Sequence, residues 1–140
     1  VGYSTLYGDT AGAFAVIKDL WKLTVYDLCR WRNEQAGYEL IPESIITKAP
    51  SAELRPDQRD DQSLPPYEVL DPLLIEIVEK GRTARELIAD GHDEAIVKRL
   101  TRLVGIAEFK RRQSPIGPRV SPKAFGKDRR VPITSRYRGH

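Results

Sequence analysis

Apolar residues at three- and four-residue steps constrain the fold of this chain more than any other feature of its sequence. This spacing is that of one helical face, and it predicts a helix over 15–36 that Gly37 can end. The apolar positions of this helix are Ile17, Leu20, Trp21, Val25, Leu28 and Trp31. The same periodicity recurs through 66–112, which we expect to be a helical region.

Local signals divide the 66–112 region into shorter helices. The stretch TARE places Glu86 three residues after Thr83, which is the spacing of a capping box that opens a helix. Asp93 can cap a later and longer helix, which we expect to end at 110–112, where three cations complement the negative end of the helix dipole. We therefore predict a mainly helical chain with long loops rich in proline and glycine.

The tail, residues 113–140, continues a run of positive charge among prolines and glycines. From Glu108 to His140 there are ten Lys or Arg residues and two acids, a balance of +8. Residues 1–107 hold thirteen cations and eighteen acids, a balance of −5, and the two sum to the net charge of +3. A basic surface attracts phosphate-bearing partners. The charge alone leaves open a nucleic-acid arm, a membrane-surface patch, a wall for the phosphates of a nucleotide, or a disordered extension.

Apolar residues spaced among the cations of the tail favour an anchored segment over a disordered one. These residues are Phe125, Val131, Ile133 and Tyr137. We expect them to hold the tail against the rest of the protein, so that its cations form a wall.

An alternative function follows from the outline of the helices expected over 83–112. A short helix, a glycine turn and a longer basic helix resemble a helix-turn-helix, so a nucleic-acid-binding module using 83–140 is the competing hypothesis. Its weakness is the position of the cations, which are densest at the end of the last helix, whereas base-reading residues usually occupy the start.

The polar segment 55–64 is predicted to be a mobile loop. Its acids Asp57, Asp60 and Asp61 resemble a metal-binding cluster, although a run of charges in a loop is usually a solvated surface. The sequence leaves open whether Asp60 or Asp61 contacts a metal or a substrate.

Composition excludes several classes of protein. A single cysteine, Cys29, excludes an internal disulfide, and with only His92 and His140 it gives no set of zinc ligands, so we expect a reduced, cytoplasmic protein. No apolar run approaches the roughly 20 residues of a membrane span, and no signal-peptide pattern is present, so we expect no membrane association. The chain opens at Val1 without a methionine, and we expect it to be a piece of a longer protein.

Three stretches taken together resemble the C-terminal half of the synthetase domain of glutamine-dependent NAD+ synthetase. They are GYSTLYGDTAGAFAVIKD at 2–19, KAPSAELRPDQRDDQSLPPYEVLD at 48–71 and FKRRQSPIGPRVSPKAFGKDRRVPIT at 109–134. They occur in order and, with the helices between them, account for nearly the whole chain. The resemblance implies that the chain is part of an α/β domain of the adenine nucleotide alpha-hydrolase type, an ATP pyrophosphatase.

The resemblance also implies a reaction. ATP adenylylates the nicotinate carboxylate of deamido-NAD+ with release of pyrophosphate, and ammonia then displaces AMP. The ammonia comes from glutamine in an N-terminal glutaminase domain of the same protein, Mg²⁺ accompanies ATP, and the enzyme is a homo-oligomer with no nucleic-acid partner. The family's Ser-Gly-Gly loop for pyrophosphate has no counterpart in 1–140, so the isolated chain is predicted to be inactive and is assigned no catalytic residue and no metal ligand.

Particular residues match the family's binding positions. Lys18 and Ser51 match positions that meet the phosphates of ATP. The positions that line deamido-NAD+ are matched by Gly2, Tyr3, Ser4, Thr5, Asp9 and Lys110. Bringing two polyanions into one cleft requires fixed cations and magnesium to offset their repulsion, which fits the basic composition of the 108–140 segment. One departure is that the family's Val-Pro-Lys-Thr is replaced here by 20–23, Leu-Trp-Lys-Leu, which leaves a helix start without its proline.

Overall fold

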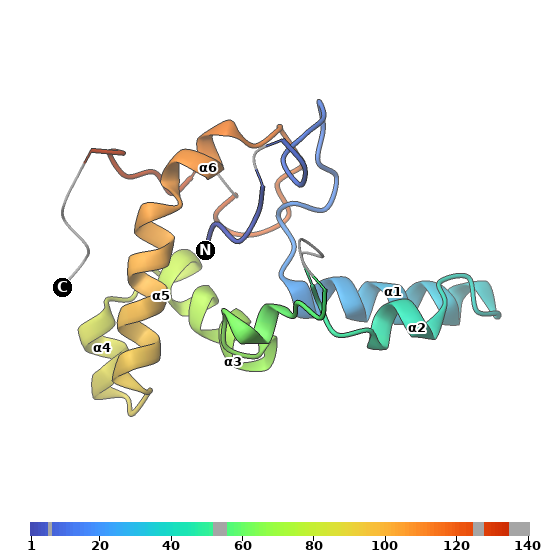
Figure 1. Cartoon of the computed structure of the whole chain (residues 1–140), viewed down its shortest axis with the longest axis horizontal. Coiled ribbons are helices and arrows are strands. Elements are labelled where there is room, and N and C mark those ends of the chain that lie inside the picture. The colour runs from blue at the N-terminus through green and yellow to red at the C-terminus, as the bar shows by residue number, and fades with distance from the viewer. Residues whose placement is uncertain (6, 52–55, 125–127, 135–140) are drawn as a thin grey trace. The chain divides into compact units, whose positions relative to one another are not determined.

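The computed structural model in Figure 1 describes residues 1–5, 7–51, 56–124 and 128–134. Its helices are α1 (Lys22–Ala36), α2 (Glu43–Thr47), the 3-10 helix η1 (Asp60–Gln62), α3 (Tyr67–Leu74), the π-helix η2 (Ile75–Glu79), α4 (Ala84–Ala89), α5 (Glu94–Ile106) and α6 (Glu108–Gln113). Over these residues the β-structure amounts to an isolated parallel bridge between Phe14 and Ile116. The prediction of a mainly helical chain is confirmed.

The chain divides into two compact units. The first unit combines Val1–Asp19 with Pro72–His140, and the second is Leu20–Asp71. The first unit therefore contains α4, α5, α6 and both ends of the chain, whereas the second contains α1 and α2.

Helix α1 of the second unit begins at Lys22, so the expected start at Ala15 is wrong. Ala15 is held elsewhere, because its N–H donates to the carbonyl oxygen of Ile116 at 2.8 Å, an extended-chain contact that a helix does not allow. No side chain at the start of α1 caps the helix. The cap comes instead from Asp71, 48 positions along the chain from Leu23, whose N–H donates to Asp71 Oδ2 at 2.9 Å. The predicted end is confirmed: Gly37 has φ +71° and donates to the last turn.

The apolar face of α1 is not covered within its own unit. The helix has no buried residue, and Leu28 and Trp31 are 40% and 48% exposed. Burial of apolar surface therefore contributes little to holding α1 in place.

The core of the first unit lies between α4 and α5, which run side by side in Figure 1. The predicted capping box opens α4, with Thr83 accepting from the N–H of Glu86 and the Glu86 carboxylate accepting in return, and Asp93 caps α5. The side chains that face inward are Leu87, Val97, Leu100 and Val104, all at 2% exposure or less. Burying each contributes about 1.5 to 3 kcal/mol.

The long helix expected from Asp93 to 112 is interrupted, which corrects the prediction. α5 ends at Ile106, and α6 begins at Glu108. The backbone of Gly2 lies against this interruption with φ +73°, and a Cβ added to Gly2 would lie 2.8 Å from the Cβ of Ala107. Glycine is therefore required at this position by both conformation and space.

Polar contacts rather than apolar anchors hold the described part of the tail. Ile133 is 53% exposed, so its expected role as an anchor is wrong, and Phe125 and Tyr137 lie outside the described residues. Val131 contributes its carbonyl oxygen, which accepts from Arg112 Nη2 at 2.9 Å.

The segment predicted to be a mobile loop, 55–64, begins outside the described residues but becomes regular at η1. The N–H of Asp60 donates to the carbonyl oxygen of Pro50 at 2.8 Å, and Leu64 is 6% exposed. Motion of this loop stays a prediction. Among the described residues, every helix is too short or too polar to cross a membrane.

Candidate functional site

Lys110 holds the N-terminal segment against α6 within the first unit. Its Nζ, on α6, donates to the carbonyl oxygen of Gly2 at 2.6 Å and to that of Ser4 at 2.5 Å. Tyr3 lies between these residues and is half-buried. A lysine ammonium has three N–H donors, so the two bonds to backbone leave one donor for a ligand. Four of the six residues expected to line a dinucleotide are thus adjacent in space.

The other two residues, Thr5 and Asp9, close a turn next to this segment. Asp9 Oδ2 accepts from the N–H of Thr5 at 2.8 Å and from its Oγ1 at 3.1 Å. The backbone hydrogen bond from Thr5 is the largest cause of a lowered pKa for Asp9, so this exposed carboxylate is charged at neutral pH. The turn fixes a negative charge beside the Lys110 ammonium.

Lys18, expected to meet the phosphates of ATP, contacts the segment that follows α6. Its Nζ donates to Ser114 Oγ at 3.0 Å and to the carbonyl oxygen of Pro115. Space is tight here, because a Cβ added to Gly117 would lie 2.3 Å from the carbonyl oxygen of Ala15 and 2.9 Å from the stem of Lys18. Only glycine lets the two segments approach so closely.

Asp19 fastens the tail beside Lys18. Its Oδ2 accepts from the N–H groups of Val120 and Ser121, each at 2.8 Å, and from Ser121 Oγ at 2.9 Å. These bonds join residues about a hundred positions apart, and the carboxylate is 9% exposed. This buried acid therefore helps to hold the tail against the segment that carries Lys18.

Glu108 is the buried counter-ion of the basic segment. It is 2% exposed, and its two oxygens accept from Arg111 Nη2 at 2.9 Å and Arg112 Nε at 3.0 Å. Burial by itself would raise the pKa of Glu108, but the hydrogen bonds from the two arginines outweigh it, so the pKa lies below its ordinary value. Arg111 also donates to the carbonyl oxygen of Val104 at 2.6 Å.

The cavity of the second unit lies near Ser51, the other residue expected to meet ATP. It has a volume of about 490 Å³ and is lined by α1, α2 and the residues that flank η1, among them Lys48, Pro50, Asp60 and Tyr67. Ser51 follows Pro50 and is half-buried. Ser51 belongs to the second unit and Lys18 to the first.

Asp60 is buried at the edge of this cavity. It is 8% exposed, its Oδ2 accepts from the Tyr67 hydroxyl at 2.8 Å, and its Oδ1 has no hydrogen-bond partner among the described residues. Burial first, and then the bond to Asp60, raise the pKa of Tyr67, which is a neutral donor at physiological pH. The structure does not describe the Asp61 side chain. Within the residues it describes, no three His, Cys, Asp or Glu side chains are grouped so as to hold a metal ion.

Sequence reasoning missed Asp19, Glu108 and Asp71 as positioning residues. Glu108 was noted only as one of two acids in a basic segment, and its spacing of three and four residues to Arg111 and Arg112 was the available signal. Asp19 and Asp71 act on residues 101 and 48 positions away, and no local pattern marks such contacts.

Comparison with known proteins places the chain in a family. The family described as NAD synthase matches residues 1–114, and the chain belongs to that family. Glutamine-dependent NAD(+) synthetase of Acinetobacter baylyi is 49% identical over 138 residues, which are 99% of this chain and 26% of that protein. Glutamine-dependent NAD(+) synthetase of Thermotoga maritima is 50% identical over 137 residues, 98% of this chain and 24% of that protein.

A solved structure is also similar. Glutamine-dependent NAD+ synthetase from Acinetobacter baumannii, in complex with adenosine diphosphate, is 42% identical and superposes with a TM-score of 0.49 over 94% of this chain and 22% of that one. The chain spans about a quarter of the length of the curated relatives it matches.

Proposed function

We propose that the chain is part of a ligase that amidates deamido-NAD+. In the first step the nicotinate carboxylate attacks the α-phosphate of ATP, the bond to pyrophosphate breaks, and an adenylylated intermediate forms. In the second step ammonia derived from glutamine attacks the acyl carbon, AMP leaves, and the amide of NAD+ results. The observation that carries the proposal is the placement of Lys110 on Gly2 and Ser4, because it brings a cation against a half-buried backbone segment more than a hundred positions away.

The residues divide between two substrates in this proposal. Gly2, Tyr3, Ser4 and Thr5 bind deamido-NAD+ together with Asp9 and Lys110, and the Lys110 ammonium both fixes the 2–5 backbone and offers its third N–H to the ligand. Lys18 and Ser51 contact the phosphates of ATP. Mg²⁺ would arrive with ATP and reduce the charge on its phosphates.

The proposal extends to a longer protein. The relatives matched over a quarter of their length are named as glutamine-dependent enzymes, which supports glutamine as the source of the ammonia. An α/β domain of the adenine nucleotide alpha-hydrolase type and an N-terminal glutaminase domain in the same polypeptide are part of the proposal. A homo-oligomeric state belongs to the same proposal.

The structure gives no observation that favours the nucleic-acid-binding alternative. Three cations of α5 and α6 are paired with acids within the chain, Lys98 with Glu94 and both Arg111 and Arg112 with Glu108. Cations already held by carboxylates contribute little to binding a duplex.

The test is NAD+ formation by the full-length enzyme from deamido-NAD+, ATP and ammonium. Lys110→Ala should lower kcat/KM for deamido-NAD+ about ten- to a hundredfold, because a charge-assisted hydrogen bond is worth roughly 1.5 to 3 kcal/mol. The loss should persist with ammonium in place of glutamine, and the basal glutaminase rate should be unchanged.

Lys123→Ala is the matched control, since Lys123 lies in the same basic tail but outside the site. Equal losses from the two substitutions would mean that the tail acts through its overall positive charge and that the role proposed for Lys110 is wrong. A wild-type enzyme that forms no NAD+ under these conditions would refute the proposed reaction.

A further inference from the structure

Two segments far apart in the sequence, 14–19 and 114–121, lie side by side in the first unit, and we call them the paired segments. Phe14 and Ile116 form a parallel bridge. The N–H of Ala15 donates to the carbonyl oxygen of Ile116 at 2.8 Å. The paired segments therefore run in the same direction and are joined by their backbones near the start of each.

Asp19 joins the paired segments again at their other end. Its Oδ2 accepts from the N–H groups of Val120 and Ser121, each at 2.8 Å, and from Ser121 Oγ at 2.9 Å. Asp19 comes four residues after Ala15. Val120 comes four residues after Ile116, so the carboxylate holds the two segments in the register that the bridge begins.

The apolar side chains of the paired segments are largely exposed. Five of them are more than half exposed, namely Phe14, Val16, Ile17, Ile116 and Val120. Asp19, by contrast, is 9% exposed. Within this chain, burial of apolar surface contributes little to the pairing, whereas hydrogen bonds to a buried carboxylate are among the stronger ones that a protein forms. The pairing therefore depends on Asp19 more than on apolar contacts.

The position of the Lys18 ammonium depends on the same pairing. Its Nζ donates to Ser114 Oγ at 3.0 Å and to the carbonyl oxygen of Pro115. Lysine has a flexible four-carbon stem, so its ammonium lies where its contacts hold it. The stem is also packed closely, because a Cβ added to Gly117 would lie 2.9 Å from it. A shift of 114–121 away from 14–19 would therefore move this ammonium.

We propose that Asp19 is a positioning residue for the phosphates of ATP, because it holds the paired segments together and thereby fixes the Lys18 ammonium. The inference rests on the proposed function, which assigns Lys18 to ATP. Asp19 acts through Lys18 and not by touching the nucleotide, since its Oδ2 is directed at the tail and a carboxylate facing phosphates would repel them.

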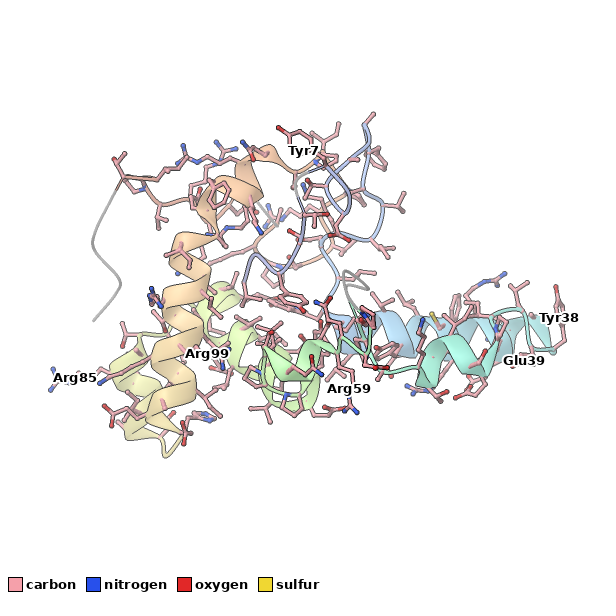
Figure 2. The ribbon with its side chains drawn as sticks, viewed as in Figure 1. Tyr7, Tyr38, Glu39, Arg59, Arg85 and Arg99 are labelled. Atoms are coloured by element: carbon pink, nitrogen blue, oxygen red, sulfur yellow. The ribbon has the colours of Figure 1, made fainter. Side chains whose placement is uncertain are left out.

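The test variants are Asp19→Ala, which removes the acceptor, and Asp19→Asn, which keeps an acceptor oxygen without the charge. The matched control is Asp93→Ala, since the Asp93 carboxylate also accepts from a backbone N–H in the first unit, that of Ile96 at 2.8 Å. Arg85→Ala is a second control, because Arg85 projects from α4 away from α5 in Figure 2. All variants are made in the full-length enzyme. Thermal melts check folding, and Asp19→Asn carries the tests if Asp19→Ala does not fold.

The first measurement needs no substrate. Reductive methylation of lysine amines, followed by mass spectrometry, reports how readily each ammonium leaves its contacts. Lys18 should be labelled severalfold faster in Asp19→Ala than in the wild type and the two controls. Lys98, whose side chain is 62% exposed, should be labelled at one rate in every protein. An unchanged rate for Lys18 would overturn the proposal.

The second measurement separates the two substrates. In Asp19→Ala the KM for ATP should rise about tenfold, since a displaced Lys18 loses a charge-assisted hydrogen bond to phosphate. The KM for deamido-NAD+ should stay within about twofold, and Asp19→Asn should recover part of the loss. A purely structural loss would lower the amount of active enzyme and leave both KM values unchanged. Equal rises in the two KM values would contradict the proposal.

The third measurement combines Lys18→Ala with Asp19→Ala. If Asp19 acts through Lys18, the double variant should lose no more kcat/KM for ATP than Lys18→Ala alone, within about twofold. Additive losses would show that Asp19 acts elsewhere and would overturn the proposal. A Lys18→Ala enzyme with the wild-type KM for ATP would instead refute the role of Lys18 in the proposed function, and faster labelling of Lys18 in Asp19→Ala would still show that Asp19 fixes its ammonium.

Discussion

Replacing Glu108 with glutamine is the most demanding test of the basic segment. The carboxylate is 2% exposed and accepts from Arg111, whose side chain is 10% exposed, and from Arg112, which is 39% exposed. Glu108→Gln removes the charge with little change in volume and leaves Arg111, Arg112 and Arg129 without a common counter-ion.

The loss should be large because breaking a buried ion pair costs about 3 to 5 kcal/mol, whereas the more exposed bond to Arg112 adds less than about 1 kcal/mol. With a urea slope of about 2 kcal/mol per M, the unfolding midpoint should fall by roughly 1.5 to 2.5 M. The assay is urea unfolding of the 140-residue chain followed by circular dichroism at a helix band.

Glu94→Gln is the matched control, since Glu94 forms an i,i+4 pair with Lys98 in which both side chains are more than 60% exposed. It should cost about 0.3 to 0.5 kcal/mol. A Glu108 variant already unfolded without urea meets the expectation. A loss no larger than that of the control would refute the view that Glu108 is a buried counter-ion.

Three further outcomes are expected. Because the pKa of Glu108 is lowered on folding, its stabilisation of the fold should be complete above the unfolded pKa of about 4.3 and be lost as pH falls through the folded value. The fall in unfolding free energy at acid pH should therefore be less steep in Glu108→Gln than in the wild type. An unchanged pH profile would contradict this. Asp19→Ala should free the backbone of Val120 and Ser121, which predicts faster proteolytic cleavage near these residues while α5 stays protected; uniform cleavage rates in variant and wild type would argue against it. The isolated chain should form no NAD+ from deamido-NAD+, ATP and ammonium, and turnover by it would show that these 140 residues suffice.

Local rules predicted the helical part of the fold. The capping box at Thr83 and Glu86, the Asp93 cap and the glycine end of α1 each depend on residues within four positions, and each is present. The start of α1 was misplaced because its cap comes from Asp71, 48 positions from Leu23, and because Ala15 pairs with Ile116 instead of entering the helix.

In the candidate site, as in the fold, contacts between residues far apart in the sequence could not be predicted from local patterns. The binding roles of Lys110 and of 2–5 came from a family resemblance, and nothing in the spacing of a residue at 110 and a segment at 2–5 indicates that they touch. The charge excess of the 108–140 segment was visible in the sequence, but its buried counter-ion was not, because composition counts charges without locating them. Burial is a tertiary property, and only the assembled structure identifies which acid is enclosed.

The bonds from Asp19 to Val120 and Ser121 have a consequence for synthesis of the protein. They join positions 101 and 102 residues apart, so they cannot form until the ribosome has passed Ser121. At about 5 to 20 residues per second, this interval lasts roughly 5 to 20 seconds. During that time the N-terminal segment lacks these bonds, and chaperones or proteases can bind it before Val120 and Ser121 do.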